Sequence, residues 1–465
     1  MKNLPSGGMR AVKHSAVLLT AAALVIGLSA LGFSTSASPE PASESRPNIL
    51  VIMTDDQGHE TLTSQFMPFT KSMIADQGIT FTRGYISTAI CCPSRASFLT
   101  GKYARHHGVH NNPDELKDPT FAEALKQSGY FTGMIGKYLN SWPGDARPEY
   151  DFWSCWLHGY NNPTMNVFGT EQSVPGYLTY VMRDYAVDFL DRVPEDKPFF
   201  LLYAPHAPHR PATPAPGDEK LYSGLAPARP PNFNPAAMPG EPAWLQAVPR
   251  MTQSDVDGID EFRLKQLRSL KSVDESVRDI LNKLREQGKL DNTFIVFYSD
   301  NGYFWGEHRL TGKDHVYEEA SRVPFALRYP PLVSSARIEV ALVGVIDLAP
   351  TICELAGVST PDGADGRSLV SLLRGTQDWR DAMLLEGWPG NDDEDRATAY
   401  APDGVPGPHY QALRTTRYLY VESDRDKSEL YDMDADPYQL NNLVDDPAKK
   451  KLLRKLRKRL KTGDY

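Results

Sequence analysis

Uninterrupted apolar runs recur along the chain and predict buried β-strands. Runs of this kind occupy residues 47–54, 199–203 and 293–299, and a shorter one lies at 134–135. Strands that lack polar alternation are typical of a sheet covered on both faces, because neither face meets water.

Apolar residues at helical spacing lie between these runs. A stripe of leucine, valine and isoleucine predicts a long helix over residues 261–287. Shorter helices are predicted over 93–101, which Pro93 would open and Gly101 would close, and over 121–129. The alternation of strands and helices predicts an α/β fold, with a large, mostly parallel sheet flanked by helices.

Two regions depart from this alternation. Residues 205–242 contain eleven prolines, so we expect an irregular segment that wraps the surface rather than forming core. After about residue 373 the pattern changes to short strands, which predicts a smaller antiparallel C-terminal subdomain. We therefore expect a catalytic domain over residues 47–372 and a C-terminal subdomain over 373–465. The short apolar runs that predict the small sheet are 383–386, 418–422 and 429–431.

Residues 1–37 are predicted to be a signal peptide and 38–46 a linker. Basic residues precede an uncharged apolar run over 16–33, and the small residues Thr35 and Ala37 suit cleavage. The alternative is a membrane anchor, since the run approaches the length that spans a bilayer. The polar residues that follow favour cleavage, so we expect a secreted protein with no stable membrane insertion.

Composition and charge exclude several classes of protein. The chain has 465 residues, with 50 Lys and Arg against 59 Asp and Glu, a net charge of -9. Nucleic-acid binders usually show the opposite balance, so we expect no nucleic-acid partner. Four cysteines are too few for a disulfide scaffold. Cys91 and Cys92 are adjacent and cannot readily bridge each other, whereas a pair between Cys155 and Cys353 is left open.

The C-terminal segment 449–461 carries nine Lys and Arg, with leucines on one helical face. One interpretation is contact with an anionic polymer or a membrane surface. The other is a terminal helix that docks its leucines and leaves its charges in water. We favour the second interpretation.

Polar residues follow the predicted strands directly. Asp55 and Asp56 come after the first strand, Asp300 and Asn301 after another, and His206 after the strand at 199–203. In parallel sheets ligands bind beyond the carboxyl ends of the strands. Carboxylate and amide oxygens suit Ca²⁺ or Mg²⁺, although each pair alone is also typical of a turn.

Cys91 lies just before the predicted helix 93–101, where helix N-termini favour anions. Arg95 in the first turn offers a forked donor for an oxyanion. A buried thiol or a redox thiol of low pKa are the alternatives for Cys91.

The segment Cys91-Cys92-Pro93-Ser94-Arg95, followed by Leu99-Thr100-Gly101-Lys102, resembles the signature of the type I sulfatases. Further motifs of that family follow in order, and together they cover nearly the whole mature chain. They are Asp55-Asp56, Gly136-Lys137, Ala204-Pro205-His206, Asp300-Asn301-Gly302, Gly312-Lys313 and Arg322-Val323-Pro324.

This resemblance implies an alkaline-phosphatase-like fold and a secreted sulfatase. It implies that a formylglycine-generating enzyme converts Cys91 into formylglycine, whose aldehyde hydrate is the nucleophile. The expected cation is Ca²⁺, with Mg²⁺ as the alternative, and its ligands would be Asp55, Asp56, Cys91, Asp300 and Asn301. The sulfate oxygens would be neutralised by Arg95, Lys137 and Lys313. His206 would face the leaving group. Apart from the resemblance, the position of His209 in the proline-rich segment leads us to expect that it contacts substrate.

One position departs from the family pattern. Many members have His two residues after the position of Lys137, whereas this chain has Leu139. The base for sulfate elimination is therefore unassigned, with His308 either that base or an exposed loop residue. The string Gly136-Lys137-Tyr138-Leu139-Asn140 resembles the N-acetylglucosamine-6-sulfatase branch.

The branch resemblance implies a sulfated-sugar substrate, such as 6-sulfated N-acetylglucosamine within a glycosaminoglycan. Three alternatives stay open at this stage. They are an arylsulfatase of broad range, a formylglycine-dependent phosphodiesterase or phosphonate monoester hydrolase, and an inactive sugar-binding protein.

Overall fold

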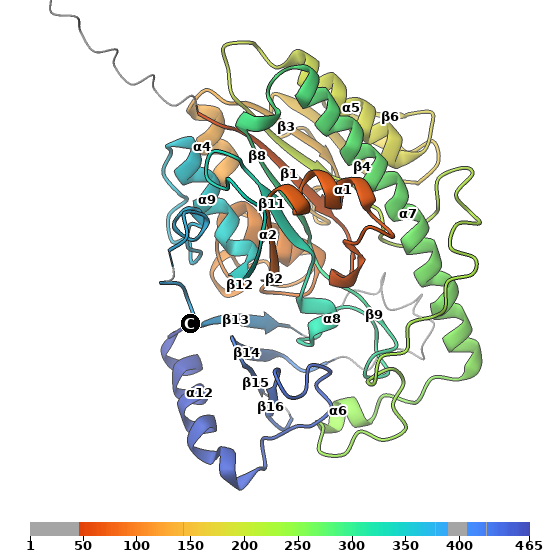
Figure 1. Cartoon of the computed structure of the whole chain (residues 1–465), viewed down its shortest axis with the longest axis vertical. Helices are drawn as coiled ribbons and strands as arrows, with labels where there is room; N and C mark the ends of the chain where they lie inside the picture. Colours follow the sequence, from red (N-terminus) through yellow and green to blue (C-terminus); the bar gives the residue numbers. More distant parts are fainter. Residues whose placement is uncertain (1–45, 143, 377, 389–406, 425) are drawn as a thin grey trace, which may run out of the picture. The chain divides into compact units, whose positions relative to one another are not determined.

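A ten-stranded sheet forms the centre of the structure, in the order β12-β2-β11-β8-β1-β7-β3-β4-β5-β6 (Figure 1). The computed structural model describes residues 46–142, 144–376, 378–388, 407–424 and 426–465. The predicted signal peptide, and all of the linker except its last residue, lie outside the described residues. The strands are β1 (Asn48–Thr54), β2 (Ile79–Tyr85), β3 (Phe131–Gly136), β4 (Phe152–His158), β5 (Thr164–Val167), β6 (Thr170–Ser173), β7 (Phe199–Ala204), β8 (Thr293–Ser299), β11 (Phe325–Arg328) and β12 (Arg337–Gly344).

The middle of this sheet is parallel. β8, β1, β7, β3 and β4 are parallel neighbours, and Leu50 lies opposite both Leu201 and Ile295. Antiparallel pairing occurs where β11 meets β2 and β8 and where β5 pairs with β4 and β6. The predicted large, mostly parallel sheet is confirmed.

Helices cover both faces of the sheet, as the unbroken apolar strands predict. Successive residues of β1 enter opposite cores, with Val51 in one and Leu50 in the other. The Leu50 core contains α5 (Leu178–Arg192) and α7 (Gln253–Glu286), with α1 (Pro68–Met73) beside it (Figure 1). The helices of the Val51 core include α2 (Cys91–Thr100), α4 (Phe121–Gln127), α9 (Leu348–Ala356) and α10 (Val370–Leu373), and α3 (Ala104–His107) contacts α2.

The long helix α7 begins eight residues earlier than the leucine stripe indicates. Thr252 caps it: the Thr252 side chain accepts from the backbone N–H of Asp255, and the Asp255 side chain accepts from the backbone N–H of Thr252. Val256 and Ile259 in the added turns are buried. The capping box was present in the sequence and marks the true start.

A second, antiparallel sheet lies in the region that we propose as the C-terminal subdomain. Its order is β13-β14-β15-β16, and the helix α12 (Lys450–Thr462) packs against β14 and β15. Leu456 and Leu460 of α12 are buried, so the docking of the leucines is confirmed. The strands are β13 (Ala382–Gly387), β14 (Tyr410–Thr415), β15 (Tyr418–Ser423) and β16 (Glu429–Asp432), of which the sequence pattern missed β14.

The proline-rich segment 205–242 contains no helix or strand, and the short helix α6 (Ala243–Gln246) follows it. The prediction that it stays on the surface is wrong in part, because Ala207, Asn232 and Glu241 are buried. Hydrogen bonds from these buried polar side chains tie the irregular segment to the rest of the protein, as in the bond from Asn232 Nδ2 to Glu319 Oε1 at 2.8 Å.

All four cysteines are described, and each is a buried free thiol. Cys155 lies on β4 and Cys353 on α9, so the pair left open by the sequence is not formed. No helix in the described ranges combines the length and the apolar character that crossing a membrane requires.

Candidate active site

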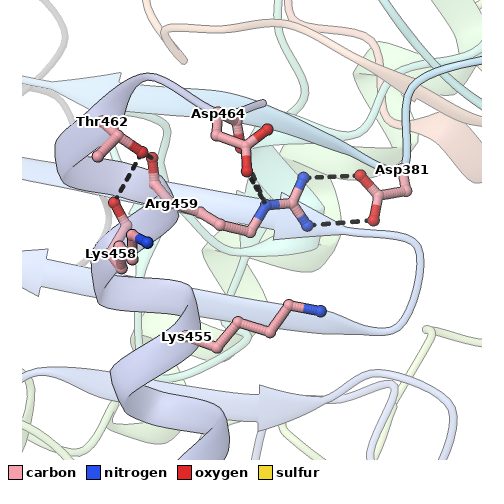
Figure 2. A pocket seen from close by; sticks show the side chains of 6 residues that line it. All are labelled: Asp381, Lys455, Lys458, Arg459, Thr462 and Asp464. Carbon is pink, nitrogen blue, oxygen red and sulfur yellow. Dashed lines mark hydrogen bonds and ion pairs between the residues drawn. The ribbon is translucent and has the colours of Figure 1, made fainter.

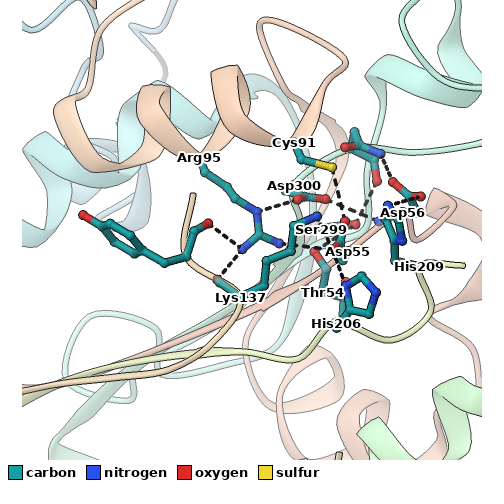
Figure 3. Close-up of polar contacts among 12 residues, drawn as sticks. Thr54, Asp55, Asp56, Cys91, Arg95, Lys137, His206, His209, Ser299 and Asp300 are labelled. Carbon is teal, nitrogen blue, oxygen red and sulfur yellow. Dashed lines mark hydrogen bonds and ion pairs between the residues drawn. The ribbon is translucent and has the colours of Figure 1, made fainter. Parts of the chain in front are cut away.

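Seven of the predicted site residues follow the carboxyl ends of four adjacent parallel strands. In the sheet order these strands are β8, β1, β7 and β3. Because neighbouring parallel strands end at one edge, residues distant in sequence meet there (Figure 3). The residues delivered are Asp300 and Asn301 after β8, Asp55 and Asp56 after β1, His206 and His209 after β7, and Lys137 after β3.

Two glycines allow the close backbone approach that this edge requires. Gly136 has φ +112°, and a Cβ there would lie 2.1 Å from the carbonyl oxygen of Ala204. A Cβ on Gly302 would lie 2.0 Å from the carbonyl oxygen of Glu319. Asp56 itself has φ 64°, a left-handed conformation that aspartate tolerates better than most residues. The motifs Gly136-Lys137 and Asn301-Gly302 are therefore also backbone requirements.

Cys91 is the first residue of α2, rather than the residue before a helix, and its side chain is fully buried. Its Sγ lies 3.4 Å from Asp55 Oδ1 and 2.9 Å from Lys313 Nζ. Burial, and then the neighbouring Asp55 carboxylate, raise the pKa of the Cys91 thiol well above its usual range. The unmodified residue is therefore a thiol, which argues against a redox thiolate of low pKa.

Three buried cations pair with the three carboxylates. Arg95 Nε lies 2.7 Å from Asp300 Oδ2, and Lys137 Nζ lies 2.6 Å from Asp55 Oδ2. Lys313 Nζ, just beyond the hairpin of β9 (Phe304–Trp305) and β10 (Thr311–Gly312), lies 2.7 Å from Asp56 Oδ1.

The neighbouring cationic groups lower the pKa of Asp55. Burial alone would raise it, but Lys137, His209, His206 and Arg95 together hold it well below its usual range. The same pairing acts on Lys137, whose pKa burial would lower and Asp55 raises. The Lys137–Asp55 pair is thus favoured in its charged form, whereas burial, and then the charge of Asp55, raise the pKa of Asp300.

The acidic side of the site fits a hard divalent cation. Asp56 Oδ2 and Asn301 Oδ1 are buried and accept no hydrogen bond, an arrangement that costs free energy unless a cation is bound. Ligand atoms of Asp55, Asp56, Cys91 and His209 all lie within 4.8 Å of one another. Oxygen donors of this kind suit Ca²⁺ or Mg²⁺.

The structure also brings Asp300 and Asn301 to this group. Asn301 Nδ2 donates to Asp56 Oδ1 at 2.6 Å, and the backbone N–H of Asp56 donates to Asp300 Oδ1 at 3.3 Å. His209 also lies beside this group, with Nε2 3.6 Å from Asp56 Oδ2. Its place depends on the irregular loop after β7, which no sequence pattern specifies.

His206 lies on the other side of Asp55. Its Nδ1 is 3.0 Å from Asp55 Oδ2, and its Nε2 is 3.3 Å from the carbonyl oxygen of Arg210. Burial, followed by the nearby His209, lowers the pKa of His206 to about 3, so the ring is neutral in the resting site. The Trp156 ring stacks on it, with centroids 3.8 Å apart. Trp156 was not predicted, because no motif marks β4.

His308 lies in the turn between β9 and β10 but is buried, so the interpretation as an exposed residue is wrong. Its ring stacks on Tyr317, with centroids 4.5 Å apart, and its Nε2 lies 3.2 Å from Asn232 Nδ2. These contacts tie it to the proline-rich segment. Leu139 is buried in the apolar core that contains α2.

Comparison with known families matches nearly the whole described chain. The family described as Sulfatase matches residues 47–358. The family described as N-sulphoglucosamine sulphohydrolase, C-terminal, matches residues 306–464.

Individual relatives agree with the family matches. The chain is 32% identical over 454 residues to human N-acetylglucosamine-6-sulfatase, covering 87% of this chain and 82% of that protein. It is 32% identical over 375 residues to a Caenorhabditis elegans protein named as an extracellular sulfatase Sulf-1 homolog, covering 74% of this chain but only 53% of that protein. A solved complex with D-glucosamine-2-N,6-O-disulfate as its substrate has a TM-score of 0.78 at 27% identity, covering 90% of this chain and 97% of that one.

Proposed function

The chain belongs to the sulfatase family of sulfuric ester hydrolases, and from this membership we propose that it hydrolyses sulfate esters of sugars, with 6-sulfated N-acetylglucosamine as the substrate. One observation carries the proposal: Cys91 is buried in the motif Cys91-Cys92-Pro93-Ser94-Arg95, with Lys313 Nζ at 2.9 Å and Asp55 Oδ1 at 3.4 Å. The resemblance to N-acetylglucosamine-6-sulfatases supports the choice of sugar.

Cys91 is proposed to be converted to formylglycine, which supplies a hydrated aldehyde as the oxygen nucleophile. The divalent cation, Ca²⁺ or Mg²⁺, would be held by Asp55, Asp56, Asp300 and Asn301 together with the modified Cys91. Three cationic side chains already balance the three carboxylates. A bound divalent metal ion would therefore give the site an excess of two positive charges. An excess of positive charge suits an anionic sulfate ester.

Lys137, Lys313 and Arg95 are proposed to stabilise charge on the non-bridging sulfate oxygens. Both ammonium groups are buried, so little water competes with the ester for them. Arg95 is held by Asp300, and its second terminal nitrogen is buried without a hydrogen bond. Buried donors fixed before the substrate arrives stabilise developing charge most effectively.

His206 is proposed to give a proton to the leaving oxygen. Both of its ring nitrogens face acceptor oxygens, on Asp55 and Arg210, a setting that the doubly protonated ring satisfies. Arrival of an anionic ester next to the ring raises its pKa and favours proton uptake. The Trp156 ring restricts its movement.

His209 is our candidate for the base that Leu139 cannot supply. One of its ring nitrogens lies within 4.8 Å of Cys91 Sγ. The ring therefore lies within reach of a proton on the modified residue. The proposal also includes secretion, because the N-terminal segment has the pattern of a signal peptide.

The test is turnover by protein co-expressed with a formylglycine-generating enzyme. We expect N-acetylglucosamine-6-sulfate to be cleaved with a higher kcat/KM than nitrophenyl sulfate or a matched phosphate diester. A higher value for the aryl ester would favour a broad arylsulfatase, and a higher value for the diester a phosphodiesterase. No turnover, despite formylglycine at position 91 by mass spectrometry, would favour a sugar-binding protein.

A further inference from the structure

The exposed face of α12 carries a concentrated positive charge on a protein whose net charge is -9. The helix runs from Lys450 to Thr462 and contains no acidic residue. The docked side presents Leu456 and Leu460, which are buried. The cations on the opposite face are Lys450, Lys451, Arg454, Lys455, Arg457, Lys458 and Lys461, all exposed.

Docking of the helix uses only a few of its cations. Arg459 is held between Asp381, at 2.6 Å, and Asp464, at 3.5 Å (Figure 2). Arg457 Nε lies 2.9 Å from Glu422 Oε1. Within the described residues the remaining exposed cations of α12 make no ion pair; we call them the basic face, and they are Lys450, Lys451, Arg454, Lys455, Lys458 and Lys461.

Repulsion among the charges of the basic face destabilises the helix itself. Lys451 and Lys455 lie one turn apart, as do Arg454 and Lys458, and like charges at this spacing destabilise a helix. Surface helices usually offset such charges with acidic residues at i,i+4, and α12 has none. The buried leucines and the ion pairs of Arg457 and Arg459 dock the helix, so its structure does not require the six charges of the basic face.

The surface beside the basic face is hollowed. A cavity of about 420 Å³ is lined by Lys455, Lys458, Arg459 and Thr462 of the helix, together with Asp381 and Asp464. In Figure 2 the Lys455 side chain extends into this area beside the paired Arg459. A ligand there would meet two lysines.

We propose that the basic face of α12 is a docking surface for a sulfated polysaccharide, which it holds while the distant ester is cleaved. The proposal rests on the proposed function, since a sulfatase of this class would meet polymers with many sulfates. Thirteen residues of helix extend about 20 Å, enough to follow several charged groups along a chain. Five of the six cations are lysines, point charges that suit scattered sulfates.

A membrane surface fits this helix less well. Helices that lie on bilayers insert an apolar face below the headgroups. Here that face is occupied, because Leu456 and Leu460 pack against the protein. Leu452 and Leu453 are partly buried as well, so what α12 offers to solvent is mainly charge, and the polysaccharide is the favoured partner.

The test compares two triple variants made in a Cys91→Ala background, which cannot turn over. One is Lys451→Gln with Lys455→Gln and Lys458→Gln. The matched control removes three exposed lysines elsewhere, at Lys117, Lys197 and Lys220. Binding to heparin is titrated at low and at physiological ionic strength.

We expect the α12 variant to bind heparin roughly tenfold more weakly and the control to change less than about twofold. A Lys→Arg triple variant at the same α12 positions should keep the binding, since it keeps the charge. Equal losses in the α12 variant and the control would overturn the proposal. So would binding of duplex DNA, or of vesicles containing phosphatidylserine, as tight as that of heparin.

In the active enzyme the α12 variant should lower kcat/KM on a sulfated polymer and leave kcat/KM on a monosaccharide sulfate unchanged. Equal effects on both substrates would overturn the docking role. Heparin binding by the Cys91→Ala protein does not depend on turnover. If the wild-type protein shows no sulfatase activity, but the Cys91→Ala protein binds heparin and loses that binding with the α12 lysines, the proposed function is overturned. The docking surface is then still supported.

Discussion

The ammonium group of Lys313 lies 2.9 Å from the sulfur of Cys91 and also contacts Asp56 at 2.7 Å. One cation thus joins the proposed nucleophile to the carboxylates of the proposed metal site. Both partners are buried, so water screens this contact little. The geometry distinguishes Cys91 sharply from the cysteine beside it.

The first prediction separates the two adjacent cysteines. Cys91→Ala should abolish turnover, because it removes the side chain that faces Lys313 and Asp55. Cys92→Ala should keep most of the activity, since Cys92 Sγ lies 3.8 Å from the carbonyl oxygen of Asp114 and from Ser141 Oγ. The measurement is kcat/KM on a sugar sulfate.

Thermal unfolding provides the control for this pair. Cys92 is fully buried, so Cys92→Ala should cost on the order of 1 kcal/mol of stability. Equal loss of activity in two folded variants would contradict the assignment of the nucleophile.

The second prediction concerns the cation. A strong chelator should inactivate the enzyme, and Ca²⁺ or Mg²⁺ should restore it. The unfilled acceptors Asp56 Oδ2 and Asn301 Oδ1 are hard oxygens, which suit these ions. Activity and Tm are measured with and without added metal.

Chelator saturated with Ca²⁺ before addition is the control for chelation itself. Restoration by Zn²⁺ alone would contradict the prediction, since Zn²⁺ prefers nitrogen and sulfur ligands in a tetrahedral site. Removal of the ion should also lower Tm, because binding stabilises the folded state.

That Asp55 and Asp300 lie close together could be predicted from the sequence, for a physical reason. Asp55 and Asp300 directly follow strands, and parallel strands end at one edge whatever the loops between them do. No comparable rule places His209 or Trp156. The first depends on an irregular loop and the second on a strand, β4, that no motif marks.

The buried acid network of Glu241 and Glu429 was also beyond sequence reasoning. Glu241 lies in the proline-rich segment and Glu429 on β16, and the hydroxyl of Tyr431 contacts both carboxyls. A contact between parts of the chain about 190 residues apart leaves no local signal.

The third prediction uses the proton count of this network. Tyr431 has one hydroxyl proton, so between two carboxyls it donates to one and accepts from the other, which must be protonated. Burial, and then the charge of Glu429, raise the pKa of Glu241 to about 8. At neutral pH Glu241 therefore carries a proton in the folded protein.

The consequence is a pH-dependent stability. Unfolding returns the pKa of Glu241 to about 4.5. The stability that its raised pKa provides is complete below about pH 4.5 and is lost as the pH rises towards 8. Glu241→Gln imitates the protonated acid, so its Tm relative to wild type should rise between pH 5 and 8, by roughly 2 °C or more.

Glu171→Gln, on the exposed strand β6, is the matched control and should show no such trend. Thermal scans at several pH values measure both variants. A constant difference between Glu241→Gln and wild type across this range would contradict a protonated Glu241.

The last prediction concerns His206 and the leaving group. A sugar hydroxyl leaves as a strongly basic alkoxide and needs a proton as the S–O bond breaks, whereas a nitrophenolate needs little help. General-acid assistance is typically worth roughly 100- to 10,000-fold. His206→Ala should therefore lower kcat/KM far more on a sugar 6-sulfate than on a nitrophenyl sulfate.

The control variant is His206→Asn, which keeps an N–H group near Asp55 but cannot transfer a proton. His206 Nδ1 lies 3.0 Å from Asp55 Oδ2, so the ring could act only by orienting that carboxylate. If so, His206→Asn would keep the activity that His206→Ala loses, and His206→Ala would lower kcat/KM on both substrates by the same factor. The acid would then have to be sought at Lys313 or His209. If His206 is the proton donor, the result is the opposite. His206→Ala and His206→Asn then lower kcat/KM equally, and only on the sugar sulfate, whose leaving group is strongly basic.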